Sequence, residues 1–194
     1  ANTLVLGVTP MIVANRISDA AAAPVAISLR VCSLIAMLTM PLIMSLWPAY
    51  AEAFARQDYG WIQRTYRHSL RLCALVWAPT IVLLALFGRP VLAAWLGDSG
   101  AVPGTLLLVS LAALKGIHAF NAMHSVVLRA MDRLSLQVAY TLTAAMLAAG
   151  TAWLYAPRIG SDGVIIAVVL IGLLPRGVAL NIELRSRLRR LGSD

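Results

Sequence analysis

Apolar runs, each ended by a charged or Pro/Gly-rich break, constrain the fold of this chain more than any other feature. Of the 194 residues, 60% are hydrophobic and 12% are charged, and that charged fraction is about half of what a soluble domain carries. The mean hydropathy is +0.82. We therefore expect an integral membrane protein. Cys32 and Cys73 lie inside apolar runs without paired spacing, so we expect two small buried side chains rather than a disulfide or a metal site.

Six of these runs are candidate membrane spans. Helices are the expected form, because an open strand edge is not satisfied in lipid and the runs lack the alternation of a barrel strand. The predicted fold is all-α: a polytopic membrane bundle of about six transmembrane helices. The first run is short of the roughly 20 residues that a span needs, so we expect a fragment that starts within a span. The approximate bounds are 2–14, 24–46, 72–87, 102–128, 134–155 and 163–182.

Lys and Arg are divided unequally between the two sides that six spans create. The links after the first, third and fifth spans hold only Arg16, Arg89 and Arg158. By the positive-inside rule, the richer side is cytoplasmic and includes the C-terminus. This clustering fits that rule better than a nucleic-acid-binding face, despite the net charge of +8. The richer links hold ten cations: Arg56, Arg64, Arg67, Arg71, Arg129, Arg133, Arg185, Arg187, Arg189 and Arg190.

One long polar interval, from Leu46 to Leu72, separates the second and third spans. On an ideal helix, apolar and aromatic side chains share one face: Tyr59, Ile62, Tyr66 and Leu70. The opposite face holds the cationic and imidazole side chains: Arg64, Arg67, His68 and Arg71. We expect a cytoplasmic amphipathic link over 51–71, formed as a helix lying in the membrane interface. Its predicted interfacial residues are Trp61, Arg64, Arg67 and Arg71.

Three cations, Arg30, Lys115 and Arg176, lie inside spans. A charge at mid-bilayer costs about 2.5–3.5 kcal/mol, so such groups normally face a bundle interior or a watered cavity. Arg30 and Arg176 lie near span ends, where snorkelling to the headgroups is an alternative. Lys115 lies roughly 20 Å from either end of its span at 1.5 Å per residue. We therefore expect it to face a polar cavity.

The span that contains Lys115 has one polar stripe. Lys115, His118, Ser125 and Arg129 share an arc of about 80°, whereas His124 points away and is interpreted as structural. For His118, a cavity-facing role and an interhelical hydrogen bond both stay open. No Asp or Glu lies deep within a span, so a cationic cavity for an anionic substrate, such as a pyrophosphate, is expected. No motif indicates an enzyme, and we assign no catalytic residue, metal or cofactor.

Residues 25–72, beginning VAISLRVCSLIAM and continuing through LWPAYAEAFARQDYGWIQR, resemble the polysaccharide flippases of the multidrug/oligosaccharidyl-lipid/polysaccharide exporter superfamily, the Wzx type. In that family, an apolar helix with an early Arg leads into a proline-aromatic stretch, a short acidic turn and a helix of the WI…R kind. The matching positions here are Arg30, Leu46, Trp47, Pro48, Ala49, Tyr50, Glu52, Ala53, Trp61, Ile62 and Arg64.

The resemblance implies a transporter with two helix bundles around a central cavity. Such a protein moves undecaprenyl-pyrophosphate-linked oligosaccharide across the bacterial inner membrane, for surface polysaccharides such as the O-antigen of lipopolysaccharide. Residues 1–194 would be a single transmembrane bundle, the second half, which needs the missing N-terminal half as its partner. Candidate cavity residues are Arg30, Lys115, His118 and Arg176.

Two other functions stay open. A multidrug exporter of the same superfamily is expected to bind cationic drugs through acidic residues, and none lies at depth here. A membrane scaffold or assembly subunit that does not transport is favoured by a bundle without a pocket, in which Lys115 is tied to backbone carbonyls.

Overall fold

The computed structural model describes residues 11, 13–15, 19–97, 102–131 and 134–167, together with 170–171, 174–175, 177–179 and 181–182. Apart from short turns, these residues are helical and include no strand, which confirms the all-α prediction for the described part of the chain. The elements are α2 (Asp19–Ala55), α3 (Tyr59–Leu83), the π-helical η1 (Leu84–Gly88), α4 (Arg89–Leu96), α5 (Thr105–Ala130) and α6 (Leu134–Ala167).

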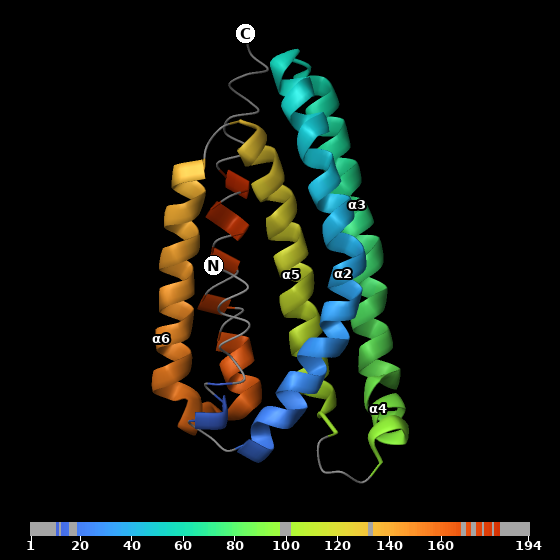
Figure 1. Cartoon of the computed structure of the whole chain (residues 1–194), viewed down its shortest axis with the longest axis vertical. Helices are drawn as coiled ribbons and strands as arrows, with labels where there is room; N and C mark the ends of the chain where they lie inside the picture. The colour runs from blue at the N-terminus through green and yellow to red at the C-terminus, as the bar shows by residue number, and fades with distance from the viewer. Residues whose placement is uncertain are drawn as a thin grey trace.

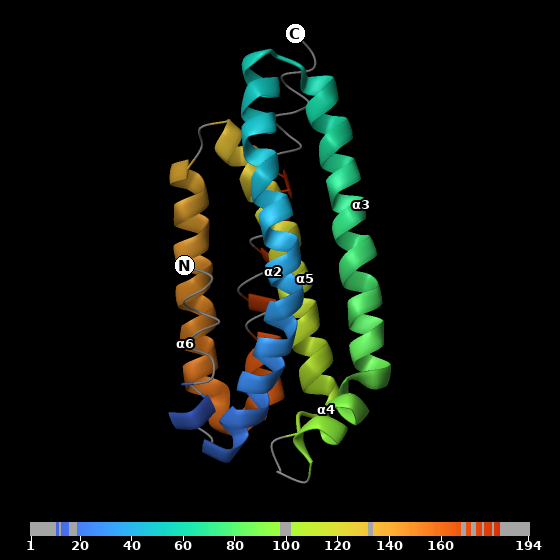
Figure 2. The ribbon, with the colours of Figure 1, turned by 45° about the vertical axis from the view of Figure 1, so that its right-hand side comes forward.

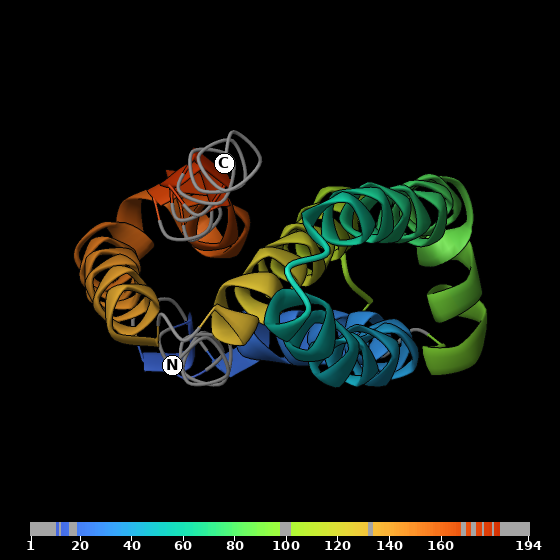
Figure 3. The same cartoon turned by 90° about the horizontal axis from the view of Figure 1, so that it is seen from above.

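Helix α5 is the axis of the structure. Figure 1 shows it between the α2–α3 pair and α6, and the view from above in Figure 3 shows the same order. Two hydrophobic clusters lie along it. One packs Leu111 and Leu114 of α5 against Cys32 of α2 and Ile165 of α6. The other packs a later stretch of α5, which includes Met123, against α2 and α3.

The polar interval forms the tip of a hairpin rather than a separate helix. Helix α2 continues to Ala55, and α3 starts at Tyr59 and runs back beside it (Figure 2). Gln57 adopts a positive φ of 58° in the turn. The carboxylate of Asp58 caps α3 by accepting a hydrogen bond from the backbone N–H of Trp61 at 2.9 Å. The predicted link over 51–71 is therefore the ends of two long helices.

The predicted division of faces on this stretch is confirmed. Ile62 and Tyr66 are buried, and Tyr59 and Leu70 are half-buried against the same cluster. Trp61 is half-buried, with its ring edge-on to Tyr50 at a centroid distance of 5.7 Å. The cationic face is exposed at Arg64, Arg67, His68 and Arg71. The hairpin forms because burial of the apolar face against α2 and α5 keeps the first turns of α3 packed alongside those two helices.

The predicted break at Gly88, Arg89 and Pro90 is a change of helix type. Helix α3 passes into the π-helical η1, which passes into α4 at Arg89. Pro90 lacks an N–H, and its ring would collide with the carbonyl four residues earlier, so widening the preceding turn keeps the chain helical. Helix α4 ends at Gly97, whose φ of 62° suits a glycine.

Helix α6 contains the break predicted at its Pro/Gly-rich end. Gly160 has a φ of 67° and a ψ of −178°, which separates two helical pieces. The predicted span 134–155 lies within the first piece. Most of the predicted span 2–14 lies outside the described residues. Within the predicted span 163–182, residues 168–169, 172–173, 180 and Arg176 lie outside them.

Within the described part of the chain, three helical stretches are long and apolar enough to cross a membrane: Ala22–Ala55, Tyr59–Leu96 and Thr105–Ala130. Large apolar side chains are exposed on the outer helices, for example Met37, Leu38 and Leu75. Such surfaces would be a liability in water but are ordinary against lipid tails. These features fit a membrane protein, whereas the count of six spans stays a prediction.

Candidate functional site

The polar centre of the bundle is the contact between α5 and α2 at Lys115. Its Nζ donates a hydrogen bond to Ser33 Oγ at 3.0 Å, and the side chain is half-buried. At 1.5 Å per residue, Lys115 lies about 15 Å from the Thr105 end of α5 and about 22 Å from the Ala130 end. It also lies between the two hydrophobic clusters, after Leu114 of one and before Ala119 of the other.

The ammonium of Lys115 has capacity for an anion. An ammonium has three donors and no acceptor. Within the described part of the chain, the hydroxyl of Ser33 is its hydrogen-bond partner, and no carboxylate lies within ion-pair distance of it. A hydroxyl leaves the positive charge uncompensated. The site therefore offers one centred positive charge with donors to spare.

Two of the other three predicted cavity residues lie within one helical turn of this contact along their helices. Arg30 is exposed on α2, one turn before Ser33, so the α2–α5 contact brings two cations to the same level of the bundle. His118 is half-buried, one turn after Lys115 on α5. Arg176 lies outside the described residues.

A second polar group centres on His124, which the sequence reading took as structural. Its ring is buried and lies edge-on to Tyr66 of α3, at a centroid distance of 5.6 Å and an interplanar angle of 82°. Nδ1 lies 2.6 Å from the carbonyl oxygen of Phe120, and Nε2 lies 3.0 Å from Nδ2 of Asn181. Since an amide N–H donates, Nε2 accepts and Nδ1 carries the proton donated to Phe120. His124 is neutral in this arrangement.

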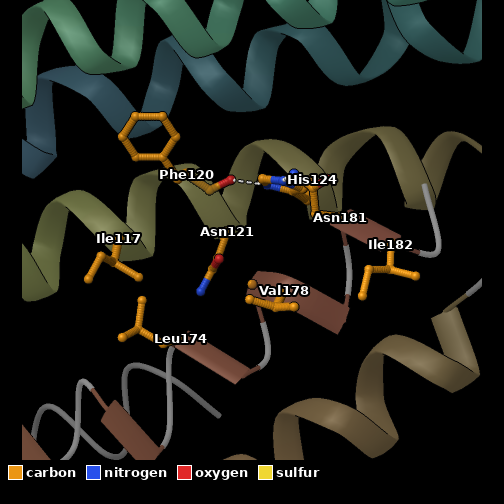
Figure 4. A pocket seen from close by; sticks show the side chains of 9 residues that line it. Ile117, Phe120, Asn121, His124, Leu174, Val178, Asn181 and Ile182 are labelled. Carbon is orange, nitrogen blue, oxygen red and sulfur yellow. Dashed lines mark hydrogen bonds between the residues drawn. The ribbon is translucent and has the colours of Figure 1, made fainter. Parts of the chain in front are cut away.

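A cavity of about 420 Å³ lies beside His124, between α5 and the C-terminal residues. Figure 4 shows Asn121 pointing from α5 toward Val178 and Leu174. Gly177 approaches so closely that a Cβ there would collide with Oδ1 of Asn121. The lining residues are Ile117, Phe120, Asn121, His124, Leu174, Gly177, Val178, Asn181 and Ile182.

Lys115 and this cavity lie on different faces of α5. Nine residues separate Lys115 from His124, and nine steps of about 100° place them on opposite sides of a helix. Sequence reasoning found the first face through its cation. It missed the second, although the neutral polar residues Asn121 and Asn181 inside predicted spans were a usable signal, because such groups bond between helices in membranes.

Comparison with known proteins gives no match: no family model, no curated protein and no solved structure matches this chain.

Proposed function

We propose that this chain is part of a transporter, a flippase that moves lipid-pyrophosphate-linked oligosaccharide across the bacterial inner membrane for cell-surface polysaccharide synthesis. Lys115 carries the proposal, because it is a half-buried cation near the middle of an apolar helix whose partner is a neutral hydroxyl. The resemblance of residues 25–72 to Wzx-type flippases supplies the substrate class.

The chemistry of a pyrophosphate fits this position. Lysine binds phosphate oxygens as a compact point charge with rotatable donors. A hydrogen bond to a charged group is worth about 1.5–3 kcal/mol, and a low local dielectric strengthens the attraction. No Asp or Glu occurs between Asp19 and Glu52 on α2, or anywhere on α5, to compete for the ammonium.

A flippase of this kind implies a membrane topology and a partner for this chain. The chain would form the second six-span bundle of a larger transporter, with its C-terminus in the cytoplasm and the N-terminal half completing the cavity. Arg30 would provide a second cation on the approach to Lys115, and Arg64, Arg67 and Arg71 would lie toward cytoplasmic headgroups. An ion gradient would drive the translocation.

The test is translocation of a labelled lipid-linked oligosaccharide by the protein and its completing half in proteoliposomes. Lys115→Ala is expected to lower the initial rate at least tenfold, because about 1.5–3 kcal/mol of charged hydrogen bonding is lost. Lys115→Arg keeps the charge and is expected to retain a measurable rate. Full activity of Lys115→Ala would remove the residue assignment.

The Lys115–Ser33 hydrogen bond also favours one alternative, a scaffold in which the lysine only ties α5 to α2. Ser33→Ala separates the two functions, because it removes the tie and leaves the charge. In a flippase it is expected to keep most of the translocation rate. In a scaffold Ser33→Ala and Lys115→Ala would impair assembly alike, and no translocation would be detected for any variant.

A further inference from the structure

We propose that the cavity between α5 and the C-terminal residues binds an uncharged lipid that carries a hydroxyl group. In this site the hydroxyl would bond to the amide of Asn181, and the hydrocarbon chain would lie against Ile117, Leu174 and Val178. The cavity volume of about 420 Å³ falls within the usual range for small-molecule sites.

The lining favours an uncharged ligand. Among the described residues that line the cavity, none has a charged side chain, and their polar groups are two amides and one imidazole. The imidazole of His124 is neutral, since Nε2 accepts from Asn181 and Nδ1 donates to Phe120. A carboxylate or phosphate placed here would lose its hydration without meeting a counter-charge.

The amide of Asn181 selects a hydroxyl. One of its two N–H groups faces Nε2 of His124 at 3.0 Å. Among the described residues, its carbonyl oxygen and its second N–H have no partner. A hydroxyl is both a donor and an acceptor, so a single O–H group can serve both free positions. A plain hydrocarbon chain would leave them unsatisfied.

The setting favours a lipid. Helix α5 is long and apolar enough to cross a membrane. Val178 and Ile182, on the opposite wall, are 58% and 64% exposed, so the cavity is open beside an apolar surface. A chain entering from the bilayer would cover that surface. The site is independent of the proposed transport, because Lys115 lies on the other face of α5.

The experiment uses the full chain in lipid nanodiscs and a hexadecanol that carries a diazirine in its chain. Photolysis followed by peptide mass spectrometry is expected to label the cavity residues of α5 and the C-terminal segment. Excess hexadecanol is expected to abolish the label. Matched hexadecanoate and hexadecane probes are expected to give little label there, because one is charged and the other lacks the hydroxyl.

Two variants sharpen the test. Asn181→Leu keeps the size of the side chain and removes the amide, so half-maximal labelling should need about thirty times more probe, the loss of two neutral hydrogen bonds of about 1 kcal/mol each. Val178→Trp fills the cavity from its exposed side and should abolish the label. This second variant tests the site independently if Asn181→Leu does not fold. Thr143→Val removes an exposed hydroxyl on α6 and is the matched control.

Circular dichroism and gel filtration establish that each variant is folded. Equal labelling by the alcohol and the alkane would contradict the hydroxyl assignment. Labelling that does not saturate, or that survives in a folded Val178→Trp variant, would overturn the site itself.

Discussion

The stability of a Lys115→Met variant distinguishes two roles for Lys115, binding of a ligand and stabilisation of the fold. Methionine has a similar length and no charge, so the substitution changes little except the ammonium. Removing the charge recovers the cost of placing it at mid-bilayer, about 2.5–3.5 kcal/mol. Losing the hydrogen bond to Ser33 costs about 1.5–3 kcal/mol. The free energy of unfolding should therefore change by between about −0.5 and +2 kcal/mol, with stabilisation favoured.

The assay is reversible unfolding of the chain in mixed micelles, driven by an increasing mole fraction of sodium dodecyl sulfate and followed by circular dichroism. Ser33→Ala is the matched variant, because it loses the same 3.0 Å hydrogen bond and keeps the buried charge. It should destabilise the fold by about 1.5–3 kcal/mol, whereas Lys115→Met should lose at most about 0.5 kcal/mol. A loss of more than about 2 kcal/mol in Lys115→Met would instead mean that the lysine stabilises the α2–α5 contact and is not kept for binding.

Two further predictions concern packing and topology. A Cβ on Gly116 would lie 3.4 Å from Cβ of Trp77, so Gly116→Ala should stabilise the α3–α5 contact by up to about 1 kcal/mol, whereas Gly116→Leu should cost about 1–3 kcal/mol by overpacking. The same unfolding assay measures both, and a clear loss of stability in Gly116→Ala would contradict the packing described here. Replacing three exposed cations by Glu should disturb membrane insertion, since each cation near an anionic leaflet is worth about 1 kcal/mol. Cysteine accessibility on both sides of vesicles measures the insertion. Normal insertion together with a changed substrate preference would contradict this prediction. These cations are Arg64, Arg67 and Arg71.

The part of the fold that the sequence predicted is the part that local pattern determines. The apolar runs 24–46 and 102–128 predicted the central part of α2 and most of α5, and the split between Ile62 and Arg64 gave the buried and exposed faces of α3. Cys32 and Cys73 are free and buried, as expected. Each of these features follows from hydropathy and from periodicity within one segment.

Tertiary packing decided what the sequence did not predict. The stretch after Leu46 was expected to form a separate interfacial helix. Instead Tyr50 of α2 and Tyr66 of α3 are buried in the cluster with α5, and α2 and α3 each extend into this stretch. The hydrogen bond between His124 and Asn181 joins positions 57 residues apart. No periodicity within one segment contains such a contact, so the sequence offered polar residue types on this face of α5, but their pairing was visible only in the folded chain.

If Lys115 binds a pyrophosphate, its ammonium contributes directly to the equilibrium affinity for a lipid-pyrophosphate-linked oligosaccharide. Native mass spectrometry of the protein with its completing half, titrated with that lipid, gives the dissociation constant for the parent and for Lys115→Met. We expect binding about 10- to 150-fold weaker in the variant, which corresponds to about 1.5–3 kcal/mol of charged hydrogen bonding. Equal affinity of the parent and a folded Lys115→Met variant would contradict it.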